Sequence, residues 1–402
     1  MKLSNKALAC GYSPMRKYYP YMVAAEQRGI HIYRLNIGQP DIATPPAYRE
    51  ALQNFEETVL AYAPSPGTPE LIAAVAEYYR KLGISYDTDD ILITTGGSEA
   101  LDLVMKSILD DGDEVLTAEP FYPNYDTVIR AAGGRLVPVP TTPEENYRHA
   151  MREKYEPLIT NRTRAILFTN PGNPTGNVLT PAELRTLADI AKEHDLYLIA
   201  DEVYREFNYT GSDMALAGSL SDATENVVLV DSVSKRFSAC GARVGALISK
   251  NKALMAQVMK FCQGRLAVAT IDQRVATALY GVSNDYFRAV REEYRRRRDV
   301  CYQKLMEIPG VVCARPEGAF YMMAKLPVDD TDKFQRWLLE EFDDNGETVT
   351  FAPGDSFYET AGSGMQEVRI AYVLEERKLA RAMEILKHAI AAYQKLEDKA
   401  DV

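Results

Sequence analysis

The stretch from Asp231 to Gly245 holds the most reactive side chains of the sequence, in Asp-Ser-Val-Ser-Lys-Arg-Phe-Ser-Ala-Cys-Gly-Ala-Arg-Val-Gly. It follows an apolar run that predicts a buried strand, so Lys235 is expected at a strand end beside Ser232. An amine near a second cation, here Arg243, is more often neutral, and a neutral amine can attack a carbonyl carbon to form a Schiff base. The hydroxyl and guanidinium groups also suit a phosphate. A solvated loop lysine is the alternative, because short motifs match by chance.

Further polar loops follow other predicted strands. Ligands of an open parallel sheet bind beyond the carboxyl ends of its strands, so these loops should meet Lys235 in one crevice. They contribute Gly97 and Ser98, Tyr122, Asn173 within Asn-Pro-Gly-Asn-Pro-Thr-Gly, and Asp201 with Tyr204.

The residue types in this crevice suit a planar, phosphorylated ligand. Gly97 and Ser98 begin a predicted helix, whose N–H groups and positive dipole end favour a phosphate. Asp201 ends an apolar strand and needs a cationic or N–H partner, which a protonated pyridine nitrogen would supply. Tyr204 can donate to a ring oxygen, and Tyr122 can stack on a ring face. Helix capping and ordinary packing are the alternatives for these residues.

Arg369 is a candidate of another kind, because it lies in a strand-like apolar run, Val-Arg-Ile-Ala-Tyr. A guanidinium among apolar residues needs a partner, and its planar fork suits the carboxylate of a substrate. A structural ion pair is the alternative.

The elements that must position these residues alternate between strands and helices from about residue 91 onward. This order predicts an α/β fold with a doubly wound, largely parallel sheet. After about residue 285 the pattern changes to long helices and a few strands. We therefore expect a large domain over residues 46–285 and a smaller α+β domain built from residues 1–45 and 286–402.

Composition narrows the class of protein. The chain of 402 residues has a net charge of −11, which argues against nucleic-acid binding. The basic run Arg295 to Arg298 is interpreted as a solvated helix face. Five cysteines without a Cys-x-x-Cys spacing favour a reducing, cytoplasmic location. No stretch approaches the roughly 20 consecutive apolar residues that span a bilayer, so no membrane association is expected.

Taken together and in order, these motifs resemble the class I/II aminotransferases, the pyridoxal-5′-phosphate (PLP) enzymes of fold type I. The resemblance covers nearly the whole chain and is strongest to the aspartate aminotransferase-like branch. It extends from Asn-Ile-Gly-Gln-Pro-Asp (36–41) through Asn-Pro-Gly-Asn-Pro-Thr-Gly (170–176), Asp-Glu-Val-Tyr (201–204) and Ser-Val-Ser-Lys (232–235) to Arg369.

The resemblance implies a role for each of the central residues. Lys235 is similar to the lysine that forms the Schiff base with PLP and then moves the substrate proton. Asp201 is similar to the aspartate that pairs with the pyridinium nitrogen and makes the ring an electron sink. Tyr204 and Asn173 match the two groups that bond the phenolic oxygen, and Tyr122 matches the residue that stacks on the ring.

The resemblance also implies the residues around the phosphate and the substrate. Gly97, Ser98, Ser232 and Arg243 lie where the family binds the phosphate. Tyr62 matches a tyrosine that reaches the phosphate of the neighbouring subunit, which implies a homodimer with shared active sites. The α-carboxylate of the substrate is assigned to Arg369, with the Gly38 backbone nearby.

One part of the family pattern has no clear match. In the best-known aspartate enzymes, a second arginine from the partner subunit holds the side-chain carboxylate, and Arg16 and Arg265 are the two candidates here. The expected reaction is ping-pong transfer of an amino group from an L-amino acid to a 2-oxo acid, with aspartate and 2-oxoglutarate favoured. Alanine, aromatic or methionine specificity and a PLP-dependent C–S β-lyase are alternatives. A PLP-binding regulatory domain and a nicotinamide-binding protein are less favoured, because a DNA-binding extension and a Gly-x-Gly-x-x-Gly motif are missing.

Overall fold

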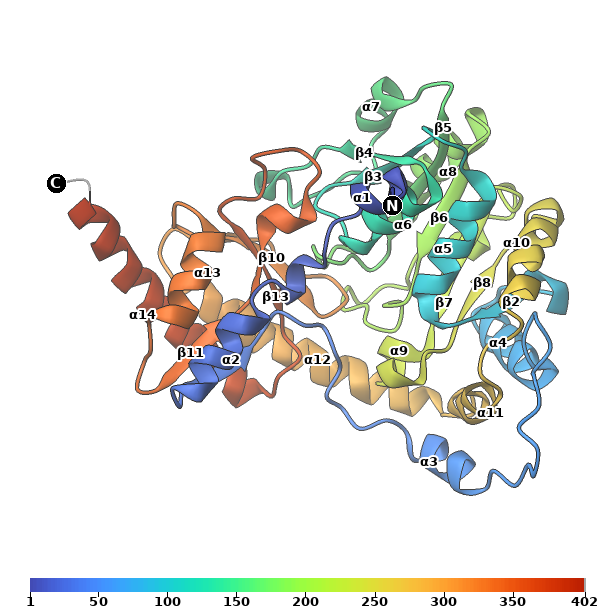
Figure 1. Ribbon diagram of the computed structural model, residues 1–402, viewed down its shortest axis with the longest axis horizontal. Coiled ribbons are helices and arrows are strands. Elements are labelled where there is room, and N and C mark those ends of the chain that lie inside the picture. The colour runs from blue at the N-terminus through green and yellow to red at the C-terminus, as the bar shows by residue number, and fades with distance from the viewer. Residues whose placement is uncertain (401–402) are drawn as a thin grey trace.

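A seven-stranded sheet forms the centre of the larger part of the molecule (Figure 1). The computed structural model describes residues 1–400, without the side chains of residue 15 and of residues 397–400. Six of the seven strands are parallel to one another. Their sequences are largely apolar, as expected for strands that helices cover on both faces of the sheet. In spatial order the strands are β2 (Ile91–Thr94), β8 (Gly245–Ile248), β7 (Val227–Ser232), β6 (Tyr197–Asp201), β5 (Thr163–Thr169), β3 (Glu114–Ala118) and β4 (Arg135–Val139).

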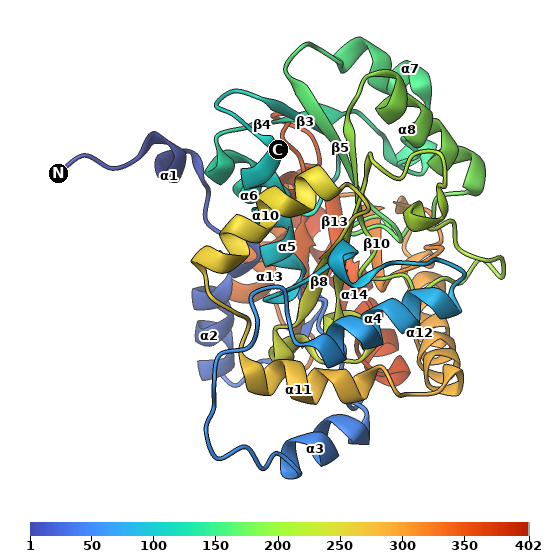
Figure 2. The ribbon, with the colours of Figure 1, turned by 90° about the vertical axis from the view of Figure 1, so that its right-hand side faces the viewer.

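Two layers of helices enclose this sheet, which confirms the doubly wound arrangement (Figure 2). One face packs against α5, α6 and α10, and the other packs against α4, α8 and α11. The start of α8 is as predicted, with Thr180 and Glu183 in a capping box and proline in the first turn. These helices are α4 (Pro69–Lys81), α5 (Gly96–Ile108), α6 (Asn124–Ala132), α8 (Pro181–Glu193), α10 (Lys252–Gly264) and α11 (Thr270–Leu279).

Strand β8 is antiparallel to both of its neighbours, which the sequence pattern did not reveal. Between β7 and β8 the chain forms only short turns, α9 (Val233–Arg236) and η6 (Cys240–Ala242). It re-enters the sheet at the carboxyl end of β7, because a parallel return needs a longer crossover. The residues that carry the predicted chemistry lie in this short connection.

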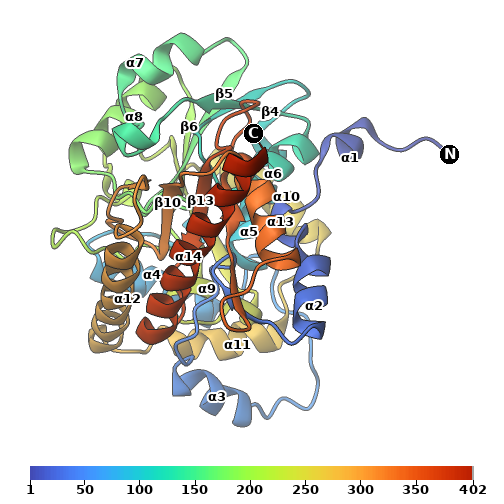
Figure 3. The same cartoon turned by 90° about the vertical axis from the view of Figure 1, so that its left-hand side faces the viewer.

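The C-terminal part of the chain builds a four-stranded antiparallel sheet of its own (Figure 3). Its order is β12 (Ala352–Pro353), β13 (Glu367–Ala371), β10 (Tyr321–Lys325) and β9 (Val312–Cys313). The N-terminal segment joins this part, because β1 (His31–Arg34) pairs in parallel with β11 (Glu347–Thr350). The helices beside these strands are α2 (Tyr19–Gln27), α12 (Asn284–Leu305), α13 (Thr331–Glu340) and α14 (Glu376–Ala400).

Helix α12 runs alongside both parts of the molecule (Figure 1), and the interpretation of its basic run as a solvated face is partly wrong. Arg296 is exposed and Arg295 is half-buried, but Arg297 and Arg298 are buried. Arg297 pairs with Asp41 at 2.5 Å, and Arg298 donates to the carbonyl of Pro316 at 3.0 Å. The helical period turns two of the four guanidinium groups inward, where they connect loops of the chain.

The remaining elements are short and lie around the edges. No helix within residues 1–400 has the length and apolar character needed to cross a membrane. The cysteines in this part of the chain form no disulfide. The short elements are α1 (Asn5–Ala9), η1 (Pro14–Arg16), α3 (Pro46–Gln53), η2 (Thr88–Asp90), η3 (Pro143–Glu145), α7 (Arg152–Tyr155), η4 (Glu156–Leu158), η5 (Ala217–Ser219) and η7 (Gly354–Phe357).

Candidate active site

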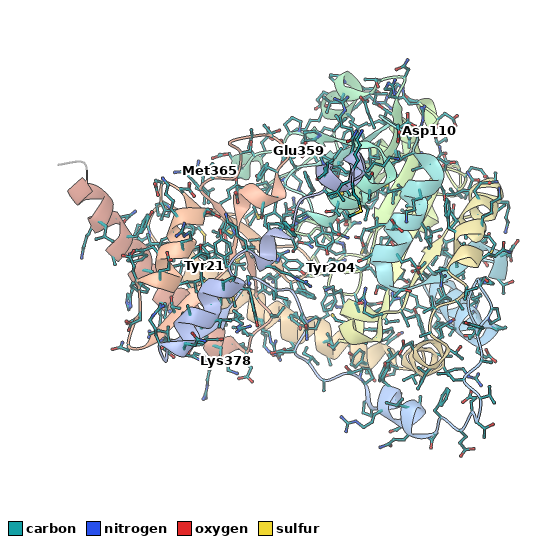
Figure 4. All side chains as sticks on the ribbon, in the orientation of Figure 1. Tyr21, Asp110, Tyr204, Glu359, Met365 and Lys378 are labelled. Carbon is teal, nitrogen blue, oxygen red and sulfur yellow. The ribbon has the colours of Figure 1, made fainter. Side chains whose placement is uncertain are left out.

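A cavity of about 410 Å³ lies at the carboxyl ends of β5, β6 and β7 and is lined from the other side by Tyr321 and Arg369 of the C-terminal part of the chain. Tyr204, one of its residues, lies near the middle of the molecule in Figure 4. Eleven of the twelve residues predicted for the site line this one cavity: Gly38, Gly97, Ser98, Tyr122, Asn173, Asp201, Tyr204, Ser232, Lys235, Arg243 and Arg369.

Tyr62 is the predicted residue that the chain does not bring to the cavity. Its side chain is 82% exposed, in the loop between α3 and α4. The two candidates for the arginine that binds the side-chain carboxylate differ in their position relative to the cavity. Arg16 lines the cavity, whereas Arg265 donates to the carbonyl of Ile93 at 2.6 Å and pairs with Glu99 at 3.1 Å.

Lys235 reaches into the cavity from α9, just after strand β7 ends. Its Nζ donates to the carbonyl of Gly38 at 3.0 Å and lies 3.9 Å from Sγ of Cys240. The ring of Tyr204 is centred 6.0 Å from the same nitrogen. The amine is therefore held by a backbone carbonyl from the N-terminal segment, and no carboxylate among the described residues forms an ion pair with it.

The end of the cavity near α5 has the donors that a phosphate requires. Gly96 adopts φ +73°, and a Cβ at this position would lie 2.4 Å from Nη2 of Arg243. Close approach of the guanidinium to the helix start therefore depends on glycine. Ser232 donates to Ser234 at 2.8 Å beside it, and the N-terminus of α5 adds its N–H groups. This donor set fits a phosphate dianion.

At the opposite end, Asp201 presents a buried carboxylate to the cavity. Tyr125 donates to it at 2.7 Å, and Tyr125 is in turn bonded to Thr169. Burial raises the pKa of Asp201 to about 6, although the Tyr125 hydrogen bond counteracts part of this effect. A cation opposite the carboxylate would lower this pKa again, which is what the protonated nitrogen of a pyridine ring would do.

Arg369 enters the cavity from β13 with its guanidinium held on several sides. Its nitrogen atoms donate to the carbonyl of Asn36 at 2.7 Å and to Oδ1 of Asn173 at 3.0 Å. The rings of Tyr321 and Phe357 lie 4.5 and 5.0 Å from its central carbon. The orientation of this buried cation is therefore fixed before any substrate binds.

Several lining residues were missed in the sequence. Tyr321 is the most notable, because its hydroxyl is 2.9 Å from that of Tyr204. It begins β10 of the C-terminal sheet, where the rule about carboxyl ends of parallel strands does not apply. Tyr125 and Thr169 follow that rule, but nothing marked them apart from their neighbours. Ser234, a hydroxyl neighbour of Lys235 in the sequence, also lines the cavity, and the other missed lining residues are Asn36, Ile37, Leu101, Val203 and Cys240.

Comparisons with known proteins agree with this site. Residues 30–386 match the family model described as aminotransferase class I and II. The chain belongs to this family. It is 32% identical over 400 residues to an aspartate aminotransferase of Bacillus subtilis, covering 97% of this chain and 99% of the relative.

Two solved structures extend the comparison to the fold. The aspartate aminotransferase of Thermus thermophilus with maleate has a TM-score of 0.87 at 31% identity, and the alanine aminotransferase of Pyrococcus furiosus has one of 0.89 at 30% identity. Both alignments cover 97% of this chain and 100% of the other. The fold is therefore that of the PLP-dependent aminotransferases of fold type I, and PLP is the cofactor of this aminotransferase.

Proposed function

We propose that this aminotransferase carries an amino group from an L-amino acid, with aspartate favoured, to a 2-oxo acid such as 2-oxoglutarate in two ping-pong half-reactions. The observation that carries the proposal is the convergence of Lys235, Asp201 and Arg369 on one cavity. They supply an amine, a buried anion and a fixed cation within a space that holds a cofactor and a small substrate.

Residues at different positions in the cavity would bind different parts of PLP. Gly97, Ser98, Ser232 and Arg243 would hold the phosphate, and Asp201 would face the ring nitrogen. Bound PLP supplies an electron sink for the negative charge that develops on the substrate Cα. Tyr122 would stack on one face of the PLP ring. Tyr204 and Asn173 would donate hydrogen bonds to the phenolic oxygen of the ring.

Proton transfer and substrate orientation belong to two other residues. Arg369 would bind the α-carboxylate and so align the Cα–H bond. Nζ of Lys235 would then take the proton from Cα of the amino acid. In the other half-reaction it would give a proton back to Cα of the new amino acid. Its contact with the Gly38 carbonyl supports this role, because it holds Nζ inside the cavity.

Arg16 is the residue that we propose for the side-chain carboxylate of a dicarboxylic substrate. It lines the cavity together with Arg369, and it forms no ion pair with any residue that the structure describes. A second cation in the same cavity favours a substrate with two carboxylates. The Thermus thermophilus aspartate aminotransferase was solved with maleate, which is a molecule of this kind.

Two further expectations concern organisation. We propose a large domain over residues 46–285 and a small domain of residues 1–45 and 286–402, supported by the β1–β11 pairing. We also propose a cytoplasmic homodimer in which Tyr62 reaches the partner's phosphate site. The exposure of Tyr62, with Val59 and Leu60 nearby, supports this second proposal.

The first test is the absorbance spectrum of the PLP-loaded protein with aspartate, alanine, tyrosine and methionine added separately. Transamination predicts that a substrate bleaches the visible band of lysine-bound PLP and that a 2-oxo acid restores it. Pyruvate and ammonia released without a 2-oxo acid would support a C–S β-lyase instead.

The second test separates the two carboxylates of the substrate. Arg16→Ala should raise KM for aspartate about tenfold or more and leave KM for alanine unchanged, because only aspartate has the second carboxylate. Arg369→Met is the matched control and should raise KM for both. An equal effect of Arg16→Ala on both substrates would contradict the assignment.

A further inference from the structure

Tyr321 contacts three of the groups on which the proposed reaction depends. Its hydroxyl lies 2.9 Å from that of Tyr204, and its ring lies 4.5 Å from the guanidinium carbon of Arg369. The hydroxyl also packs against Gly38, where a Cβ would lie only 1.8 Å from it. The same Gly38 accepts the hydrogen bond of Lys235.

The contact with Arg369 follows from the register of β10 and β13. Met323 is the direct cross-strand partner of Arg369, so Tyr321, two residues earlier on β10, is on the same face as its diagonal neighbour. Aromatic side chains are long enough for this diagonal contact. The ring therefore faces the guanidinium as a consequence of strand pairing.

The contact with Tyr204 constrains where protons point. Both tyrosines are almost completely buried, and each hydroxyl has a single proton to donate. The two hydroxyls share one hydrogen bond, so only one of the two protons lies between them. If Tyr204 donates its proton to an oxygen of the cofactor, Tyr321 must donate to Tyr204. A hydroxyl that accepts a hydrogen bond is also a better donor.

We propose that Tyr321 is a positioning residue with two separable parts, a hydroxyl that directs and strengthens the donation by Tyr204 and a ring that orients Arg369. The hydroxyl acts on the cofactor through Tyr204, whereas the ring acts on the α-carboxylate through Arg369. This inference rests on the proposed function, because it assigns the cofactor oxygen to Tyr204 and the α-carboxylate to Arg369.

Two substitutions separate these parts. Tyr321→Phe removes only the hydroxyl. It should raise the spectroscopic pKa of the lysine-bound PLP by about half a unit, because weaker donation to the phenolic oxygen leaves more negative charge beside the imine proton. The KM values for aspartate and alanine should change less than twofold. Tyr321→Leu also removes the ring and should raise both KM values about fivefold to thirtyfold, because the cation–π contact is lost.

A double-substitution cycle tests whether the hydroxyl acts through Tyr204. In a Tyr204→Phe background, Tyr321→Phe should cause no further shift of the spectroscopic pKa. Tyr155→Phe is the matched control, because it removes a buried hydroxyl that bonds His149 outside the site, and it should leave the spectrum unchanged. An unchanged spectroscopic pKa in Tyr321→Phe, or a shift that persists without the Tyr204 hydroxyl, would overturn the proposal.

The spectroscopic titration requires bound PLP but no turnover. A wild-type protein that binds PLP and fails to transaminate would contradict the proposed function and leave the titration of Tyr321→Phe valid. Failure of the two proposals can therefore be told apart.

Discussion

Asp201 and Asp231 are both buried at the carboxyl ends of neighbouring strands, β6 and β7, yet their carboxyl pKa values move in opposite directions. Burial raises the pKa of Asp201 to about 6, although the Tyr125 hydroxyl, the backbone N–H of Val203 and, more weakly, the charge of Lys235 counteract part of this effect. Burial acts on Asp231 as well, but the guanidinium groups of Arg236 and Arg205 outweigh it and lower the pKa. Asp231 forms ion pairs with Arg236 and Arg205, whereas Asp201 forms no ion pair with any residue that the structure describes.

The cations of Asp231 belong to a set of buried residues behind the cavity, which we call the back cluster: Asp231, Arg236, Arg205, Glu202 and Tyr79. Arg236 donates to Asp231 at 2.7 Å, and Arg205 pairs with Glu202 at 3.2 Å. Tyr79 accepts from Arg205 at 2.6 Å and lies 3.1 Å from Asp231. Two buried anions are thereby paired with two buried cations.

The back cluster and the site are built from adjacent residues of the same short segments. Glu202 follows Asp201, Arg205 follows Tyr204, Asp231 precedes Ser232, and Arg236 follows Lys235. In each pair one side chain lines the cavity and its neighbour belongs to the cluster. The charges of the cluster pair with one another and hold the backbone, whereas the site residues present polar groups to the cavity for a ligand.

The largest expected effect comes from removing a site residue that acts chemically. Lys235→Ala should lower the transamination rate by roughly 10⁴-fold, because no other amine lines the cavity in the part of the chain that the structure describes. Some PLP should remain bound noncovalently, since the phosphate and ring contacts are intact. Initial rates and the PLP content of the purified variant provide the measurement. Turnover near the wild-type rate would show that another group moves the proton.

A substitution in the back cluster should instead affect folding. Asp231→Asn leaves Arg236 and Arg205 buried without their shared anion and should lower the free energy of unfolding by about 3–5 kcal/mol. Urea unfolding of the cofactor-free chain measures this loss. Asp222→Asn is the matched control, because Asp222 pairs with Arg185 and Lys192 on the surface, and it should cause no measurable change. Equal stability of the two variants would mean that the cluster does not hold the backbone.

Sequence patterns predicted the large sheet and most of the site because both follow local rules. Apolar runs marked the strands, and side chains at their carboxyl ends meet by topology. The reversal of β8 and the burial of Arg297 and Arg298 depend on which segments come together in space, so no local pattern revealed them. Tyr321 was missed for the same reason, since it reaches the cavity from a second sheet.

The raised pKa of Asp201 also predicts how the stability of the cofactor-free chain depends on pH, and this effect is smaller than that of Asp231→Asn. The pKa of Asp201 in the folded chain, about 6, is above the value of 3.8 for an unperturbed aspartate. The folded state therefore binds this proton more tightly, and the contribution of Asp201 to stability falls as pH rises from about 4 to about 6. This difference in pKa corresponds to about 3 kcal/mol, which is lost by pH 7 in the cofactor-free chain.

Asp201→Asn isolates this contribution, because other carboxyl groups titrate in the same range. The difference in unfolding free energy between the cofactor-free variant and the cofactor-free wild type should grow in favour of the variant between pH 4 and pH 6. Saturating PLP should reduce that advantage, since a cation opposite Asp201 lowers its pKa and stabilises the ionised form. A difference that does not change with pH would show that Asp201 is already paired within the chain, as Asp231 is, and would remove the contrast between the two carboxylates.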